Sequence, residues 1–345
     1  NATQYLSWSE VGIINLNATL TDNDYLSSGQ DVISFVEYVG RFVPDHFNAR
    51  VSYNGSLKEA CSNHFTYIGQ NMTYEDEPEL IIEAQNSTNG TTNNYNENFV
   101  YLKKEGVDIN ATKHDVNQNG TNNEPLQLEA YIKDGAIEDK DGFNGTVTYK
   151  LSSKDKFIYI HSANSKVDPF NSSLNLNATR IVDDDGVKAS GIPPYATIEP
   201  LGVEMRFGRL NIKNSYGSEL QNQTVPIQAE YYKVYDKNGT FVINEKDSCT
   251  NASINAGTDA VALQLKNEED AWQAASQEID LANNESETNG STKGIELRSE
   301  NDNGNSLFLD NGKVELVLNA PDENTTGNVY TGYVYIQGNL TSSHP

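Results

Sequence analysis

Cysteine, methionine and tryptophan are scarce in this sequence, which has two of each among 345 residues. The two cysteines, Cys61 and Cys249, leave three alternatives open: quiet core thiols, metal ligands or a single disulfide. A zinc site would need a second pair of closely spaced ligands to accompany Cys61-Ser-Asn-His64, and the sequence lacks one. The shortage of cysteine therefore argues against zinc.

Basic residues and long apolar runs are also few. Lys and Arg number 24 against 49 Asp and Glu, which gives a formal net charge of −25 and an isoelectric point near 4.4. Such a chain repels nucleic acid and anionic lipid, so neither is expected as a partner. No apolar run approaches the roughly 18 residues of a membrane-spanning helix, so no membrane insertion is expected. Because the sequence begins at Asn1, without an initiator Met or a signal peptide, we expect a mature or excised chain.

Motifs for catalysis are missing as well. No Gly-x-Ser-x-Gly turn occurs, and the five histidines stand in unlike contexts. With so many acidic residues, some carboxylate pairs will lie close together by accident. The sequence therefore predicts no catalytic residues and a protein that is not an enzyme.

Tyrosine and phenylalanine are plentiful, with 19 and 11 residues, and can fill the cores of β-sheets. Short alternating or β-branched segments recur between Asn-, Thr- and Gly-rich turns, a pattern typical of β-sandwiches rather than βαβ units. The sequence predicts an all-β fold of tandem β-sandwich domains, Ig-like or jelly-roll-like, with one short helical insertion. That helix is expected over residues 267–282, where alanines recur at helical spacing.

Three blocks are expected along the chain. Residues 1–45 read as a β segment at the end of a preceding domain, residues 46–190 as one sandwich and residues 200–345 as another. Pro44 ends the first block, since proline cannot donate in a central strand, and residues 183–194 connect the other two. The strand candidates of the two sandwiches are residues 80–84, 99–102, 126–132, 147–151, 157–161, 203–212, 225–235, 241–244, 306–309, 314–318 and 329–336.

Asn-x-Ser/Thr sequons are in excess. The chain has 18 of them, whereas its 43 asparagines and 51 Ser and Thr would give about 6 by chance. Many lie beside turn residues, where a sugar could project into solvent. Low complexity without modification is the alternative, but we favour a glycosylated surface protein. The best candidates for glycosylation are Asn86, Asn89, Asn119, Asn284 and Asn289.

Several motifs follow one another in an order that resembles a bacterial family. They are Val39-Gly-Arg-Phe-Val-Pro-Asp-His-Phe47, Cys61 with Phe65-Thr-Tyr-Ile-Gly-Gln70, Met205-Arg-Phe-Gly-Arg-Leu210, Asp247-Ser-Cys-Thr250 and Asn311-Gly-Lys-Val-Glu-Leu-Val-Leu-Asn-Ala-Pro321. In these motifs the chain is similar to the C-terminal region of MshQ-like proteins, bacterial surface proteins associated with mannose-sensitive haemagglutinin type IV pili. That region is itself a domain of unknown function, so the resemblance implies a location and an assembly rather than a reaction.

The resemblance implies three further features. Cys61 and Cys249 both fall inside its motifs, so we expect them to form a disulfide in the oxidising setting outside the cell. Relatives continue with a Trp-Leu strand and an Arg-Glu segment that this chain lacks, so the last sheet is expected to miss its closing strands. The strand at residues 329–336 would then be an uncovered edge that binds another subunit or a second copy by strand addition.

Calcium is the cofactor that the sequence leaves open. Asp183, Asp184 and Asp185 offer clustered oxygen ligands at a turn, although they do not match the helical calcium-loop template, and turns are in any case rich in Asp. The main hypothesis is a non-catalytic extracellular component of a pilus or surface appendage, structural or adhesive. The alternative is a lectin-like or calcium-dependent module with glycans as partners, and a polysaccharide-active enzyme comes third.

Overall fold

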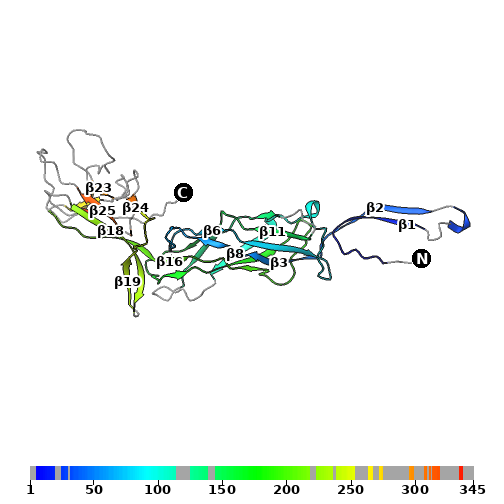
Figure 1. Ribbon diagram of the computed structural model, residues 1–345, viewed down its shortest axis with the longest axis horizontal. Coiled ribbons are helices and arrows are strands. Elements are labelled where there is room, and N and C mark those ends of the chain that lie inside the picture. Colours follow the sequence, from blue (N-terminus) through cyan, green and yellow to red (C-terminus); the bar gives the residue numbers. More distant parts are fainter. Residues whose placement is uncertain are drawn as a thin grey trace, which may run out of the picture.

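Three β-rich parts follow one another along the long axis of the molecule (Figure 1). The computed structural model describes residues 5–19, 25–29, 32–113, 125–138, 144–217, 223–235, 238–252 and 311, together with short strands between residues 263 and 336. No α-helix occurs in this described part of the chain, and its secondary structure is strands with a few 3-10 turns. The predicted all-β class is confirmed.

The first part is a projecting two-stranded ribbon, drawn in blue in Figure 1. Its strands β1 (Gly12–Thr19) and β2 (Ile33–Phe42) are antiparallel, and a short 3-10 turn, η1 (Tyr25–Ser27), lies between them in the chain. Two register shifts bend the pair, and Tyr38 and Gly40 adopt positive φ on the longer strand. Such β-bulges add one residue to one strand and increase the local twist.

The central part is the sandwich. A four-stranded sheet has the order β10 (Ala136–Glu138), β11 (Thr146–Lys150), β7 (Glu79–Gln85) and β3 (His46–Tyr53). A three-stranded sheet has the order β15 (Thr197–Ile198), β14 (Leu174–Ile181) and β8 (Val107–Lys113). Smaller sheets complete it: β12 (Lys156–Tyr159) with β9 (Leu128–Tyr131), β4 (Ser56–Lys58) with β6 (Thr73–Asp76), and β13 (Phe170–Asn171) with β16 (Glu204–Arg206) and β5 (Thr66–Tyr67).

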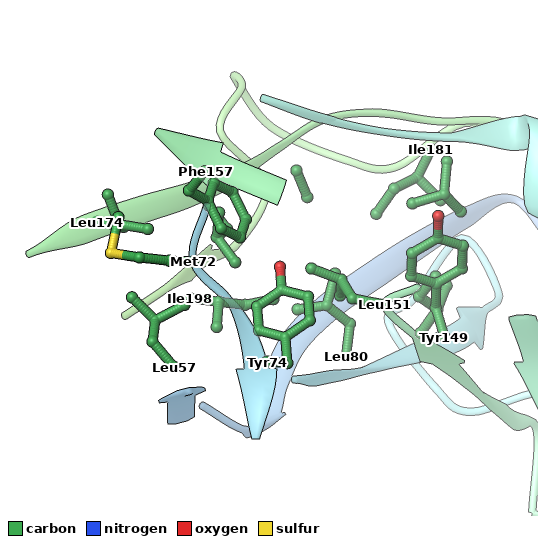
Figure 2. Close-up of a cluster of buried hydrophobic side chains, with 14 of the residues drawn as sticks. Leu57, Met72, Tyr74, Leu80, Tyr149, Leu151, Phe157, Leu174, Ile181 and Ile198 are labelled. Atoms are coloured by element: carbon green, nitrogen blue, oxygen red, sulfur yellow. The ribbon is translucent and has the colours of Figure 1, made fainter. Parts of the chain in front are cut away.

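The sandwich core follows from the alternation of buried and more exposed residues along its strands. In β7 every second residue is buried, and Leu80, Ile82 and Ala84 are fully so, because alternate side chains of a strand point to one face. Figure 2 shows side chains of this sheet, among them Leu80 and Tyr149, in one cluster with side chains from elsewhere in the sandwich, such as Phe157 and Leu174. Each Leu or Ile side chain buried in this way stabilises the fold by about 1.5–3 kcal/mol.

Some strands of the sandwich differ from the predicted ones. Strands β8 and β14 were not predicted, because Asn and Thr occupy their outward positions and hide the apolar half of the pattern. In β14, Leu174, Leu176 and Ala178 are nevertheless buried. Residues 99–102 contain no strand, and Phe99 instead ends a 3-10 turn, η2 (Glu97–Phe99); a second such turn, η3 (Lys104–Gly106), follows.

The third part begins at β17 (Gly208–Ile212). Its main sheet has the order β17, β18 (Gln223–Tyr235), β25 (Lys313–Leu318) and β23 (Ile295–Arg298), and β19 (Asn238–Ile243) also pairs with β18. The core cluster of the sandwich continues through Met205 and Phe207 into this part, where it includes Tyr232 of β18. Val187 and Ala189, within the predicted connector at residues 183–194, belong to the same core, and the predicted domain bounds stay a prediction.

The prediction of a helix over residues 267–282 is wrong for the part of this range that the structure describes. Trp272–Ala274 form strand β22, which pairs with β21 (Leu263–Lys266), and the rest of that range lies outside the described residues. Pairing with a neighbouring strand has overridden the local helical propensity of the alanines. Strand β21 also pairs with β26 (Val334–Ile336), and β20 (Asn251–Ala252) pairs with β24 (Leu307–Phe308).

Candidate functional site

The site with the most organised chemistry lies between the sandwich and the third part of the chain. We call it the joint, and define it by Cys61, Phe65 and Tyr67 from the sandwich, Glu204 and Arg206 from the crossing strand β16, and Tyr231, Asn244, Asp247 and Cys249 from the third part. Strand β16 runs parallel to β5, with Arg206 opposite Tyr67. The joint therefore brings together the three motifs that contain Cys61, Arg206 and Cys249.

A disulfide joins the two sides. Cys61 and Cys249 are bonded, as predicted, with their Cα atoms 5.6 Å apart and a separation of 188 positions in the sequence. Asn63, close to Cys61, donates its side-chain amide to the carbonyl of Lys246 at 2.7 Å. The loop that holds one cysteine is thus also hydrogen-bonded to the loop that holds the other.

Arg206 is the central side chain of the joint. Only 5% of the residue is exposed, and its guanidinium lies 4.7 Å from the ring centre of Phe65 and 4.6 Å from that of Tyr231. Its Nε and Nη2 donate to the same oxygen of Glu204 at 2.6 and 2.5 Å, while Nη1 donates to Asn244. Burial of an arginine is costly unless its charge and its N–H groups are satisfied, and here both conditions are met.

The network continues through three more buried groups. Asn244 donates its side-chain amide to the Tyr67 hydroxyl at 2.6 Å, and that hydroxyl donates to Asp247 at 2.8 Å. The other carboxylate oxygen of Asp247 accepts the backbone N–H groups of Cys249 and Thr250 at 3.2 and 2.8 Å. Asp247 is 0% exposed, so the network carries a fully buried carboxylate next to the disulfide.

Electrostatics and close packing keep this network in one state. Burial, and then the neighbouring charge of Asp247, raise the pKa of Tyr67, so its hydroxyl keeps its proton and remains a donor. Gly208 lies against the same ring, and a Cβ at Gly208 would come within 2.4 Å of it. A side chain at Gly208 would therefore displace Tyr67 and break the chain of hydrogen bonds.

The chemistry available at the joint is limited. Cys61, Asp247 and Cys249 are the one group of three potential metal ligands that comes together within the described residues. Their two sulfur atoms are bonded to each other, so they are not thiolate ligands in this state. The arrangement is suited to holding two domains together.

The three aspartates considered for calcium have separate partners. Arg41 pairs with Asp185, and Lys103 pairs with Asp184. Asp183 accepts the backbone N–H groups of Asp185 and Val187 at 3.0 and 2.9 Å, and burial raises its pKa. Among the described residues, the three carboxylates do not come together as a group of potential metal ligands. Calcium binding therefore stays a prediction.

Two of the five glycosylation candidates lie in the described chain. Asn89 is exposed at a turn with φ of 63°. Asn86 is half-buried, its carbonyl oxygen accepts from Thr88 and Gly90, and its amide donates to the carbonyl of Ser9 at 3.2 Å. A sugar needs the amide nitrogen of asparagine, so Asn89 is the better acceptor in the folded chain. Asn119, Asn284 and Asn289 lie outside the described residues.

The predicted edge strand at residues 329–336 is described only in part. Val334–Ile336 form β26, which stands at one side of the sheet β22-β21-β26. Its role in assembly stays a prediction. Within the described chain, no helix is long and apolar enough to cross a membrane.

Sequence reasoning found the disulfide but missed the network around it. Arg206, Tyr67 and Asn244 were not singled out as individual residues, although the first two lay inside recognised motifs. The usable signal was a charged Arg206 between Met205 and Phe207, because a charge within an apolar strand segment needs a buried partner.

Comparisons with known proteins place the chain in a family. No curated protein matches its sequence. Among solved structures it is similar to one described as "FdeC, a Novel Broadly Conserved Escherichia coli Adhesin Eliciting Protection against Urinary Tract Infections", at 10% identity over 90% of this chain and 70% of that chain, with a TM-score of 0.22. At that score the similarity carries no argument. Family models match residues 10–198, as "DUF6701, third domain", and residues 206–343, as "DUF6701, fourth domain". The chain belongs to the DUF6701 family, and the joint lies where its third and fourth domains meet.

Proposed function

We propose that this chain is a non-catalytic structural segment of an extracellular assembly, in which the joint holds two consecutive domains in a fixed relation. The assembly that its resemblance to MshQ-like proteins suggests is a pilus or another surface appendage, with further subunits as partners. The observation that carries the proposal is the buried joint, in which a disulfide and the Arg206 network connect the third and fourth domains.

Three features support a structural role. The polar groups of the joint are directed at one another rather than at an open site, so they stabilise contact between domains. The disulfide requires an oxidising compartment, which agrees with export. The parts follow one another along one axis (Figure 1), as in a spacer.

The first experiment tests the assembly. Cells that produce the natural protein with Cys61→Ser and Cys249→Ser together should retain the polypeptide at reduced level and lose surface appendages or adhesion. Immunogold labelling of intact cells and counts of appendages per cell are the measurements. A polypeptide found only inside the cell, or unchanged appendages in a strain that lacks the gene, would contradict the proposal.

The second experiment tests the fixed relation of the domains. Small-angle X-ray scattering of the purified chain should give a narrow distribution of maximum dimensions, and the double serine variant should give a broader one. Thr112→Ser is the control, since its side chain lies in β8, remote from the joint in sequence and sheet. Equal distributions for the variant and the parent chain would show that the joint does not fix the two domains.

A further inference from the structure

The N-terminal ribbon presents apolar side chains to solvent. In β2, Ile33, Phe35, Val36 and Tyr38 are 63, 61, 55 and 76% exposed, and in β1 Ile13 is 46% exposed. Isolated apolar residues are common on protein surfaces, but a contiguous set of this kind marks an interaction site. The ribbon is therefore an exposed apolar surface suited to an interaction.

Both faces of the ribbon are apolar. Leu16 is paired with Val36, and Asn17 with Phe35, and directly opposed residues of an antiparallel pair lie on the same face. Because Phe35 and Val36 are consecutive, they point to opposite faces, so one face carries Leu16 and Val36 and the other carries Phe35. Strands that are apolar on both faces are typical of sheets covered on both sides.

The ribbon leaves the sandwich in a fixed direction. At its base Val11 is 3% exposed within the sandwich core, and Glu10 accepts the backbone N–H of Asn94 at 3.1 Å. On the other strand, Arg41 pairs with Asp185 and lies 4.0 Å from the ring centre of Tyr101. These contacts anchor the base, so the ribbon is an extension of the sandwich rather than a free tail.

A two-stranded sheet of this kind buries too little apolar surface to be stable by itself. Isolated hairpins are at best marginally stable in water, and they gain stability from a third strand or from packing on one face. The described chain supplies neither, since the sheet of β1 and β2 contains no other strand. An occupant is needed for both faces.

We propose that the ribbon docks into the domain that precedes the third domain in this family, and that its two strands are covered there on both faces. The family numbering itself places earlier domains before the segment that matches residues 10–198. Residues 5–9 reach the sandwich from the side on which the ribbon projects (Figure 1), so a domain placed before them lies beside the ribbon.

A second copy of the chain is the less suitable occupant. Each copy carries a net charge of −25, and two such chains repel each other. A face-to-face pair of ribbons would also leave one apolar face of each ribbon in water. This inference is independent of the proposed appendage, because it concerns only contacts within one polypeptide.

Hydrogen exchange tests the docking. We would compare the 345-residue chain with a polypeptide in which the family's second domain precedes residue 1 in its natural connection. In the longer polypeptide, the amides of β1 and β2 should exchange at least tenfold more slowly, while those of β7 should be equally protected in both. Equal exchange of the ribbon in the two polypeptides would overturn the proposal. A 345-residue chain that is dimeric by light scattering, with its ribbon already protected, would also overturn it in favour of a second copy.

Substitution separates docking from general effects. Phe35→Asp and Val36→Asp, each in the longer polypeptide, should restore fast exchange of the ribbon, since they place a charge on opposite faces. Leu201→Asp is the matched control, because Leu201 is 73% exposed and bridges to Ser56 of β4, a strand that does not pair with the ribbon, so the variant should change nothing. If only one of the two ribbon variants has an effect, one face alone is covered, and the insertion proposed here is wrong.

Discussion

The sandwich carries two opposite kinds of surface, the joint and the ribbon. In the joint, charged and polar groups such as Arg206 and Asp247 are withdrawn from water and bound to one another. In the ribbon, apolar groups such as Phe35 and Tyr38 face water. The contrast shows that Arg206 and Asp247 already have partners within this chain, whereas apolar side chains of the ribbon are exposed on both of its faces.

Removal of the disulfide should have the largest effect. Cys61→Ser with Cys249→Ser is expected to lower the free energy of unfolding by about 5 kcal/mol, because a loop closed over 188 residues constrains the unfolded chain strongly. Urea denaturation monitored by tryptophan fluorescence measures this change in the free energy of unfolding. The parent chain in reductant should match the double variant, and the variant itself should not respond to reductant. A loss below about 1 kcal/mol would contradict the entropic account.

Removal of the buried guanidinium should come next. Arg206→Met is expected to destabilise the joint by about 3 kcal/mol, because Glu204 and Asn244 lose their donor. Arg180→Met is the control, since Arg180 pairs with Asp108 at an exposed site and should cost less than about 1 kcal/mol. If the two variants were equally stable, the burial of Arg206 would have no energetic consequence.

A buried carboxylate in the sandwich should respond to pH. Asp155 is 0% exposed and accepts only one short bond, from the Lys133 N–H at 2.8 Å, and burial raises its pKa to about 6. Its pKa in the unfolded chain is near 3.8. Between these values the folded state holds more protons, so the stability that Asp155 contributes is full below pH 3.8 and falls as pH rises through 6, by about 2 kcal/mol.

The measurement for Asp155 is the difference between two unfolding curves. Asp155→Asn should be less sensitive than the parent chain to a change from pH 4 to pH 6.5, and the difference between them isolates this residue from the many other carboxylates. Identical pH dependence in both would show that Asp155 does not titrate in this range.

Truncation of the ribbon should have the smallest effect. Phe35→Ser is expected to change the unfolding free energy of the 345-residue chain by less than about 0.5 kcal/mol, because 61% of this residue is already exposed to water. Phe47→Ala, at a residue that is 0% exposed in the sandwich, should cost about 3–5 kcal/mol. A large effect of Phe35→Ser would mean that the ribbon already has an occupant.

The sequence predicted the parts of this molecule whose signal is local. Alternation gave strands such as β7 and β11, and recognised motifs gave the pairing of Cys61 with Cys249. It could not give the partners of Arg206, because Phe65 and Tyr231 lie far away in the chain and meet only through the tertiary fold. The projection of the ribbon was equally hidden, since an apolar segment such as residues 32–39 has the same pattern whether it is covered or not.

The disulfide also decides what happens when the polypeptide is cut. Cys61 and Cys249 enclose most of the sandwich and the crossing strand, so any single cleavage of the main chain between them leaves two pieces that are still covalently attached. Outside a cell, where proteases are common and reductants are scarce, one cut in an exposed turn of this region would not release the fourth domain. The chain would therefore survive nicking, and its loss would require reduction or a second cut beyond Cys249.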